Sequence, residues 1–302
     1  SRPGSCRGAA RSTTEARMET AWSERMKGEP RSENDYSQRQ TEAARRVLID
    51  LGQVLASFAD CLVVVGGWTP DLLLPDADVP HVGSIDVDIA LDAAKLNDGR
   101  YAELLHLLLD TKRYRRGEKD FQLVVEVDLK DGKKPVQVAL EFLAPKEVKL
   151  KKRNTKLLTD FRVLQIEAAS EAFRDPVEIE LEGRNVRGAG NKVHLRIVSL
   201  AHFLVMKAHA IGGRDKPKDT YDLCYCLDHY TGSMKSLAEP WKRRIDEANI
   251  AKAVRILQDK FASVDAFGPQ QLVEFHGDFD VTTQEMQARR AFQLVQNFLS
   301  FL

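Results

Sequence analysis

The segment GSIDVDIALD, residues 83–92, carries acidic side chains at alternate positions of an otherwise apolar stretch. This alternation predicts a β-strand in which Ser84, Asp86 and Asp88 point to one face and the apolar residues between them point to the core. Residues two apart on a strand lie about 6.6 Å apart, so the two aspartates repel each other unless a proton or a cation intervenes. A divalent metal with oxygen ligands is the simplest such cation, and a solvated edge strand is the alternative interpretation.

The composition limits the classes of function. The chain has 302 residues, with 45 Lys and Arg against 45 Asp and Glu, and a formal net charge of zero. No overall charge points to a nucleic-acid or membrane partner, so any contact with a polyanion must be local. The four cysteines form no CxxC pair, and neither a membrane span nor a signal peptide is apparent. We therefore predict a cytoplasmic protein with no membrane partner.

Residues 1–40 are polar and poor in β-branched residues. The Arg-, Ser- and Gly-rich opening before Met18 is expected to derive from expression or from an extended start. The remainder is expected to be disordered or to form a loose helical arm. We predict that residues 1–40 are a tail outside the fold.

Residues 41–198 switch between helical and strand patterns. The spacing of apolar residues predicts helices over 41–58 and 100–114, with a short helix at 71–74. Residues 199–302 are helical in character throughout, which predicts an α/β (α+β) fold: a mixed β-sheet domain over 41–198 and an α-helical C-terminal domain over 199–302. The strands are expected at 61–65, 83–92, 121–129, 136–143, 177–181 and 193–198.

Two features accompany the acidic strand. The apolar run 61–65 ends in Gly66 and Gly67, which predicts a buried strand that leads into a tight turn. Glycines at such a turn let backbone N–H groups approach a phosphate that a Cβ would obstruct. In VQVALEFL, residues 136–143, Glu141 points away from the apolar face and is a third carboxylate outside the core.

The order of these features resembles the nucleotidyltransferase fold of the DNA polymerase beta superfamily. The match runs through VVVGGW (63–68), SIDVDIAL (84–91) and VALEFL (138–143). A second block, KAHAIGGRDKPKDTYDLCYCL (207–227), is similar to the C-terminal motif of the AbiEii-like nucleotidyltransferases, known chiefly as toxins of bacterial toxin–antitoxin systems. Together the blocks span roughly residues 60–230.

The resemblance implies a metal-dependent enzyme that moves a nucleoside monophosphate from an NTP to RNA, tRNA above all, or to a protein hydroxyl. Asp86 and Asp88 are expected to ligate two magnesium or manganese ions, and Glu141 to ligate the ion that activates the acceptor hydroxyl and to take its proton. A cognate antitoxin is a possible partner. The residues expected to bind the nucleotide are Gly66, Gly67, Ser84, Lys207, Arg214, Lys216, Asp219 and Asp222.

Within this set, Lys207 and Lys216 are the favoured triphosphate contacts, with Lys218 as a further cation. Trp68 follows the glycines where superfamily members often have a hydroxyl residue, and Glu141 stands where an Asp is usual. These departures favour an alternative function, a non-catalytic nucleotide- or partner-binding module of the same fold. A DxD glycosyltransferase is a third hypothesis. The basic run 146–156 could dock RNA phosphates, but a solvated face is the default interpretation.

Overall fold

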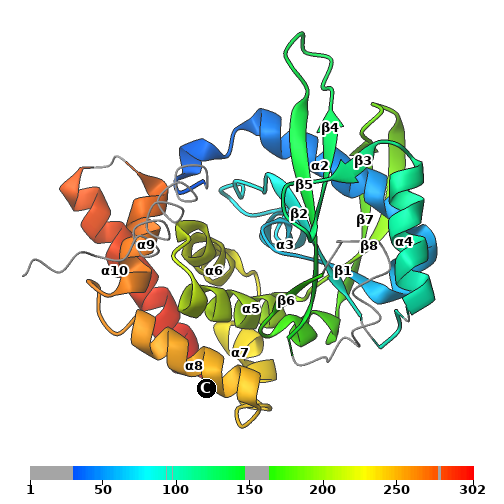
Figure 1. Cartoon of the computed structure of the whole chain (residues 1–302). Coiled ribbons are helices and arrows are strands. Elements are labelled where there is room, and N and C mark those ends of the chain that lie inside the picture. Colours follow the sequence, from blue (N-terminus) through cyan, green and yellow to red (C-terminus); the bar gives the residue numbers. More distant parts are fainter. Residues whose placement is uncertain (1–29, 93, 97, 147–162, 278–279) are drawn as a thin grey trace, which may run out of the picture.

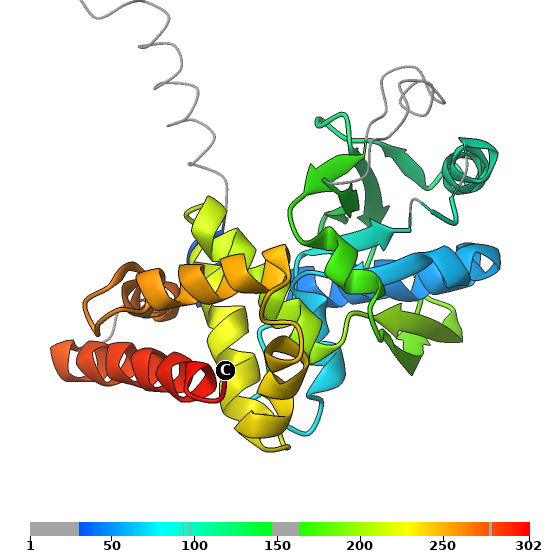
Figure 2. The same ribbon diagram turned by 90° about the horizontal axis from the view of Figure 1, so that it is seen from below.

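The chain folds as a sheet half and a helical half, which lie side by side in the computed structural model (Figure 1, and from below in Figure 2). This arrangement confirms the predicted fold class, a mixed sheet followed by C-terminal helices. The described residues are 30–92, 94–96, 98–146, 163–277 and 280–302. Their α-helices are α2 (Gln38–Val54), α3 (Trp68–Leu73), α4 (Asp98–Asp110), α5 (Leu200–Gly213), α6 (Pro217–His229), α7 (Met234–Lys242), α8 (Ala248–Lys260), α9 (Phe267–His276) and α10 (Val281–Leu299).

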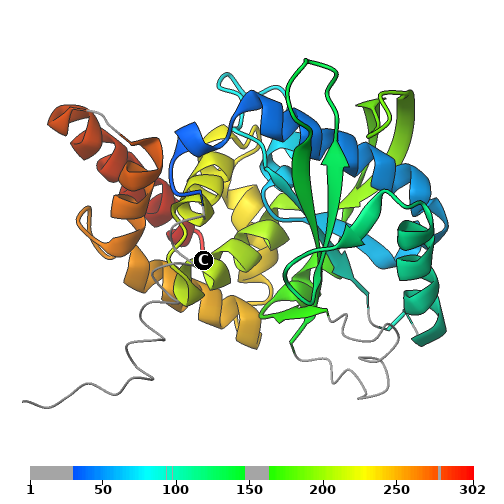
Figure 3. The same cartoon turned by 45° about the horizontal axis from the view of Figure 1, so that its top comes forward.

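The sheet in the described residues consists of β1 (Leu62–Val65), β2 (Asp86–Leu91), β3 (Tyr114–Arg116), β4 (Gln122–Val127), β5 (Val136–Pro145), β6 (Leu164–Ile166), β7 (Val177–Arg184) and β8 (Gly190–Ile197). The spatial order is β3-β4-β5-β2-β1-β8-β7, and β6 pairs with β5. β2 pairs with β5 in parallel and with β1 antiparallel, so the acidic strand is central in the sheet. The β4–β5 hairpin projects beyond the other strands, and α2 crosses the sheet close to it (Figure 3).

The two faces of β2 belong to different environments, as the alternation predicts. Val87 and Ile89 are buried in a core that α2 and α4 cover. Ala90 packs into a second core, which is built mainly from the helical half. Asp86 and Asp88 precede Ala90 on its face, so their carboxylates lie on the side of the sheet that faces the helical half.

The segment before α2 packs against the helical half. Ser37 caps α2, its side chain accepting a hydrogen bond from the N–H of Gln40. Tyr36 is buried against Phe275 of α9, with 5.8 Å between the ring centroids. Residues 30–40 are predicted from the sequence as part of a tail. In the structure this segment contacts the fold, because the Tyr36 ring packs against α9. Residues 1–29 and most of the basic run 146–156 lie outside the described residues.

None of the helices that the structure describes is both long and apolar enough to cross a lipid bilayer.

Candidate active site

The register of the central strands brings the three predicted carboxylates together. Asp88 pairs directly with Glu141 of β5, and Asp86 pairs with Ala139 on the same ladder. Paired residues on neighbouring strands point to the same face, with the strands about 4.8 Å apart. Asp86, Asp88 and Glu141, the acidic cluster, therefore share one side of the sheet.

The turn after β1 abuts the acidic cluster. Val65 pairs with Asp88, so Gly66 directly adjoins the Asp88 side chain. Gly66 has a φ of +72°, and a Cβ on it would lie only 2.2 Å from Asp88 Oδ2. A Cβ on Gly67 would lie 2.7 Å from Ser84 Oγ. Gly66 thus requires glycine, a Cβ on Gly67 would displace neighbouring side chains, and the bare backbone of the turn lies beside the carboxylates.

The electrostatics of the two aspartates differ. Burial acts to raise the pKa of Asp86, but Lys216 and a 2.6 Å hydrogen bond from Ser84 Oγ outweigh it and lower the pKa. For Asp88, burial and the neighbouring charges of Asp86 and Glu141 raise the pKa to about 8. The raised pKa of Asp88 shows that burial and two neighbouring carboxylates oppose a further negative charge here, and a bound cation would relieve this repulsion.

Glu141 is held by two side chains of the neighbouring β3–β4 region. Its Oε1 accepts hydrogen bonds from Lys119 Nζ at 3.1 Å and from Gln122 Nε2 at 2.8 Å. Accordingly, no group of three or more His, Cys, Asp or Glu side chains is arranged to hold a metal among the described residues. The chemistry of the cluster, three carboxylates with mutual repulsion, nevertheless fits a hard divalent cation.

The charged block of the helical half forms a separate, internally paired network. Lys207 Nζ of α5 lies 2.7 Å from Asp219 Oδ1 and 2.7 Å from Asp222 Oδ2 of α6. Burial lowers the pKa of Lys207, but these two carboxylates outweigh it and raise the pKa. Arg214 Nε binds Asp219 at 2.6 Å, and Lys218 Nζ binds Asp222 at 2.6 Å. These contacts fix α5 against α6; the predicted contact of Lys207 with the triphosphate stays a prediction.

Two lysines connect this network to the acidic cluster. The Lys218 ammonium lies beside the turn, since a Cβ on Gly67 would be 2.9 Å from its Nζ. Lys216 precedes α6, is half-buried, and makes no ion pair with any residue in the described ranges. Its charge contributes to the lowered pKa of Asp86. Of the block's cations, Lys216 is therefore the one that is both close to the acidic cluster and unpaired.

His81, for which the sequence gives no ligand spacing, joins the two halves. Its Nδ1 accepts a hydrogen bond from the N–H of Gly83 at 3.0 Å, so Nε2 carries the proton and donates to Asp222 Oδ1 at 3.0 Å. Burial and the charge of Lys218 lower the pKa of His81 to about 4. We call Lys207, Arg214, Lys218, Asp219, Asp222 and His81 the paired network.

Trp68 and Thr69, which follow the glycines, are both buried. Trp68 Nε1 donates a 2.8 Å hydrogen bond to the carbonyl oxygen of Asp86, which links α3 to the start of β2. The hydroxyl of Thr69 is buried without a hydrogen-bond partner in the described part of the chain. The turn therefore offers backbone N–H groups, and not a side-chain hydroxyl, to the space beside the carboxylates.

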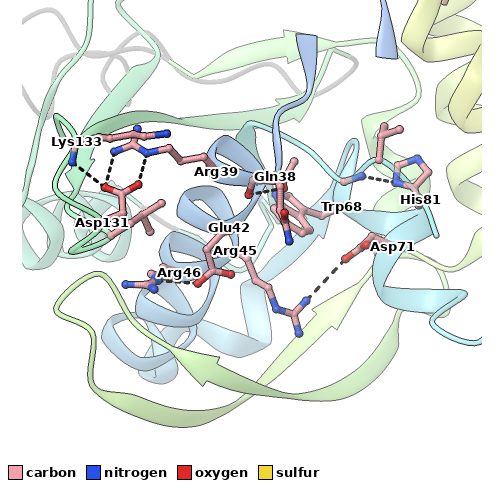
Figure 4. Close-up of a pocket in the computed structure, with 14 residues that line it drawn as sticks. Gln38, Arg39, Glu42, Arg45, Arg46, Trp68, Asp71, His81, Asp131 and Lys133 are labelled. Atoms are coloured by element: carbon pink, nitrogen blue, oxygen red, sulfur yellow. Dashed lines mark hydrogen bonds and ion pairs between the residues drawn. The ribbon is translucent and has the colours of Figure 1, made fainter. Parts of the chain in front are cut away.

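A polar cavity of about 580 Å³ lies between the start of α2, α3, the segment 81–83 and the β4–β5 hairpin (Figure 4). No member of the acidic cluster lines it. Each carboxylate that lines it is paired with an arginine, so the cavity holds no unpaired carboxylates like those of the acidic cluster. The pairs are Arg39 with Asp131, Arg45 with Asp71, and Arg46 with Glu42.

The comparison with protein-family models agrees with the predicted resemblance. The family model described as "Nucleotidyl transferase AbiEii toxin, Type IV TA system" matches residues 50–295. Among solved structures, the chain is similar to an antigenic nucleotidyltransferase-like protein from Paracoccidioides brasiliensis, with 17% identity, a TM-score of 0.37, and coverage of 72% of this chain and 94% of that chain. No curated protein matches the chain.

Proposed function

Because the chain belongs to the AbiEii nucleotidyltransferase toxin family, we propose that it transfers a nucleoside monophosphate from an NTP to a hydroxyl of RNA, tRNA above all, in the cytoplasm. The observation that carries this proposal is the pairing of Asp88 with Glu141 and with the glycine turn on neighbouring strands. A toxin-like activity of this kind calls for a cognate antitoxin as a partner.

The glycine turn and the nearby lysines receive the triphosphate. The N–H groups of the turn lie beside the carboxylates, and Lys216 brings a positive charge that no described carboxylate pairs. Lys218 is held at Gly67 by its bond to Asp222, so it orients the turn from the helical half. Phosphate groups are bound well by such a combination of backbone donors and ammonium groups.

In the reaction, the acceptor hydroxyl oxygen forms a bond to the α-phosphorus while the bond to the bridging oxygen of the β-phosphate breaks. Pyrophosphate leaves, and the hydroxyl proton passes to Glu141. Asp86 and Asp88 are the ligands for Mg²⁺ or Mn²⁺, with Glu141 as the third. When bound, the metal neutralises the charge that develops on the entering and leaving oxygens.

The test is transfer of label from each α-³²P-labelled NTP, with magnesium or manganese, into a mixture of total RNA and protein. The double variant Asp86→Ala, Asp88→Ala is run beside the wild type. We expect labelled RNA that disappears in the variant. Equal labelling by the two proteins would contradict the assigned carboxylates.

A second candidate function is binding of a nucleotide or a partner without turnover. The contact of Glu141 with Lys119 and Gln122 favours it, because these side chains already occupy one oxygen of this carboxylate. Metal and NTP binding without labelled product from any nucleotide would support this candidate.

A further inference from the structure

The strand order separates the two sides of the acidic cluster. On one side of β2, the turn after β1 adjoins Asp88, and on the other side β5 carries Glu141, with β4 beyond it. In-line displacement requires the entering and leaving groups on opposite sides of the phosphorus. If the triphosphate lies at the turn, the acceptor therefore enters over β5 and β4.

Lys119 and Gln122 are the polar groups that meet an acceptor on this side. Gln122 pairs with Glu141 in the register of β4 and β5, and Lys119 lies in the turn before β4 with its side chain 52% exposed. Gly117 makes room for this arrangement, since a Cβ on it would lie 2.6 Å from Gln122 Oε1. The contact with Glu141 is thus built into the turn.

The Lys119 ammonium shares its carboxylate partner with the cluster, so its charge is less compensated when Glu141 also ligates a metal. It lies 5.5 Å from the centre of the Phe121 ring, so the ring supports the side chain near the cluster. Arg115 of β3 lies on the same face of the sheet, but its guanidinium is bound to Glu126 at 2.9 Å. Lys119 is therefore the cation that an acceptor meets here. A phosphate is a partner that such an exposed ammonium recognises.

We propose that Lys119 and Gln122 form the acceptor subsite, in which Lys119 binds a backbone phosphate of the RNA next to the attacking hydroxyl. In the absence of acceptor, the same lysine holds Glu141 in a resting orientation. This inference rests on the proposed function and selects a nucleic acid over a protein as the acceptor, since a protein hydroxyl brings no neighbouring phosphate.

The test compares Lys119→Met with Lys192→Met. Lys192 is a matched control because its side chain is 53% exposed and bound to Glu180 at 2.8 Å, on the distant β7–β8 pair. Binding of bulk tRNA is measured by filter retention at several salt concentrations. The apparent KM values for tRNA and for NTP are measured in the transfer reaction.

We expect Lys119→Met to weaken tRNA binding about tenfold and to reduce the slope of log affinity against log salt by about one. The KM for NTP should change less than twofold, and Lys119→Arg should restore most of the tRNA affinity. Equal tRNA affinity and salt slope in the Lys119→Met and Lys192→Met proteins would overturn the subsite, even if transfer to RNA occurs. Label in protein but not in RNA would also overturn it while leaving nucleotidyl transfer intact. Because tRNA binding needs no turnover, a failure of the proposed function gives a different pattern, with no label in any acceptor.

Discussion

Two groups of buried or half-buried charges meet at the centre of this protein, and they differ in how the charges are compensated. In the paired network, Lys207, Lys218 and His81 surround Asp222, so each charge has a partner of opposite sign or a hydrogen bond. In the acidic cluster, Asp88 faces two other carboxylates, and its pKa is raised to about 8 by burial and by both neighbours. Charges that are paired within the protein stabilise the fold, whereas carboxylates that repel one another are suited to binding a ligand of opposite charge.

The largest effect is expected from Asp222→Ala, which leaves Lys207 and Lys218 buried without one of their carboxylates. Breaking a buried ion pair costs about 3–5 kcal/mol. The free energy of unfolding, measured by urea denaturation, should fall by about that amount. Asp215→Ala is the control, because Asp215 is 51% exposed and its pair with Arg31 is worth about 1 kcal/mol or less. Similar losses in the two variants would mean that the network does not support the fold.

The second prediction concerns the acidic cluster. Asp88→Asn removes a carboxyl whose ionisation is opposed by burial and by two neighbouring carboxylates, so the metal-free variant should be at least as stable as the wild type in the same denaturation experiment. Its transfer activity should fall at least about 100-fold, because charge stabilisation of the transition state is lost. A clear loss of stability in Asp88→Asn would show that Asp88 stabilises the fold, as the carboxylates of the paired network are expected to do.

The third prediction addresses the turn. Gly66→Ala places a Cβ against Asp88 Oδ2 in a left-handed backbone conformation, so we expect a loss of about 1–2 kcal/mol in stability together with a fall in activity. Gly132→Ala is a matched control, since Gly132 has a φ of +76° and nothing within 4 Å of the added Cβ. In Gly132→Ala, stability should fall only by the cost of the left-handed backbone conformation, and activity should be unchanged. Equal activity of the two variants would show that the contact of the turn with Asp88 is unimportant.

The smallest effect is the pH dependence of stability without metal. Native His81, with its lowered pKa, stays neutral where the unfolded chain is protonated, so its contribution to the free energy of unfolding rises from about pH 4 to about pH 6.5. Native Asp88, with its raised pKa, keeps a proton that the unfolded chain releases, so its contribution falls as the pH rises from about 4 to about 8. The lowered pKa of Asp222 acts in the opposite direction and only below about pH 4, where its contribution to stability is lost. Unfolding in EDTA at several pH values should show a decline on the order of 1 kcal/mol from about pH 6.5 to about pH 8, where Asp88 alone of these three groups acts, and Asp88→Asn should abolish it. An unchanged slope in the variant would assign the decline to another group.

The local pattern of the sequence predicts the central strands because alternation and burial act over a few residues. GSIDVDIALD gives the correct face for Val87 and Ile89, and the Gly66-Gly67 turn follows a buried strand as expected. Strands β3 and β6 have three residues each, too few for a periodic signal, and α7 contains Pro240, which normally ends a helix. These elements depend on tertiary contacts that the local pattern does not contain.

The sequence predicts which residues belong to the candidate site, but not which of them form ion pairs and hydrogen bonds with one another. Lys207 and Asp219 are twelve positions apart on different helices, and only their packing makes them ion-pair partners. His81 bonds to Asp222 across 141 residues. Its position five residues before Asp86 is the one signal in the sequence, and this signal does not distinguish a packed histidine from a functional one. The contact of Lys119 with Glu141 depends likewise on the turn geometry around Gly117.

The most direct measurement is calorimetric titration of Mg²⁺, with a non-hydrolysable NTP analogue, into the wild type, Asp88→Asn and Asp215→Ala proteins. If the acidic cluster is completed by a metal and nucleotide, the wild type and Asp215→Ala should bind equally, and Asp88→Asn should bind at least about tenfold more weakly. Equal binding by all three proteins would contradict the assignment of the acidic cluster as the active site.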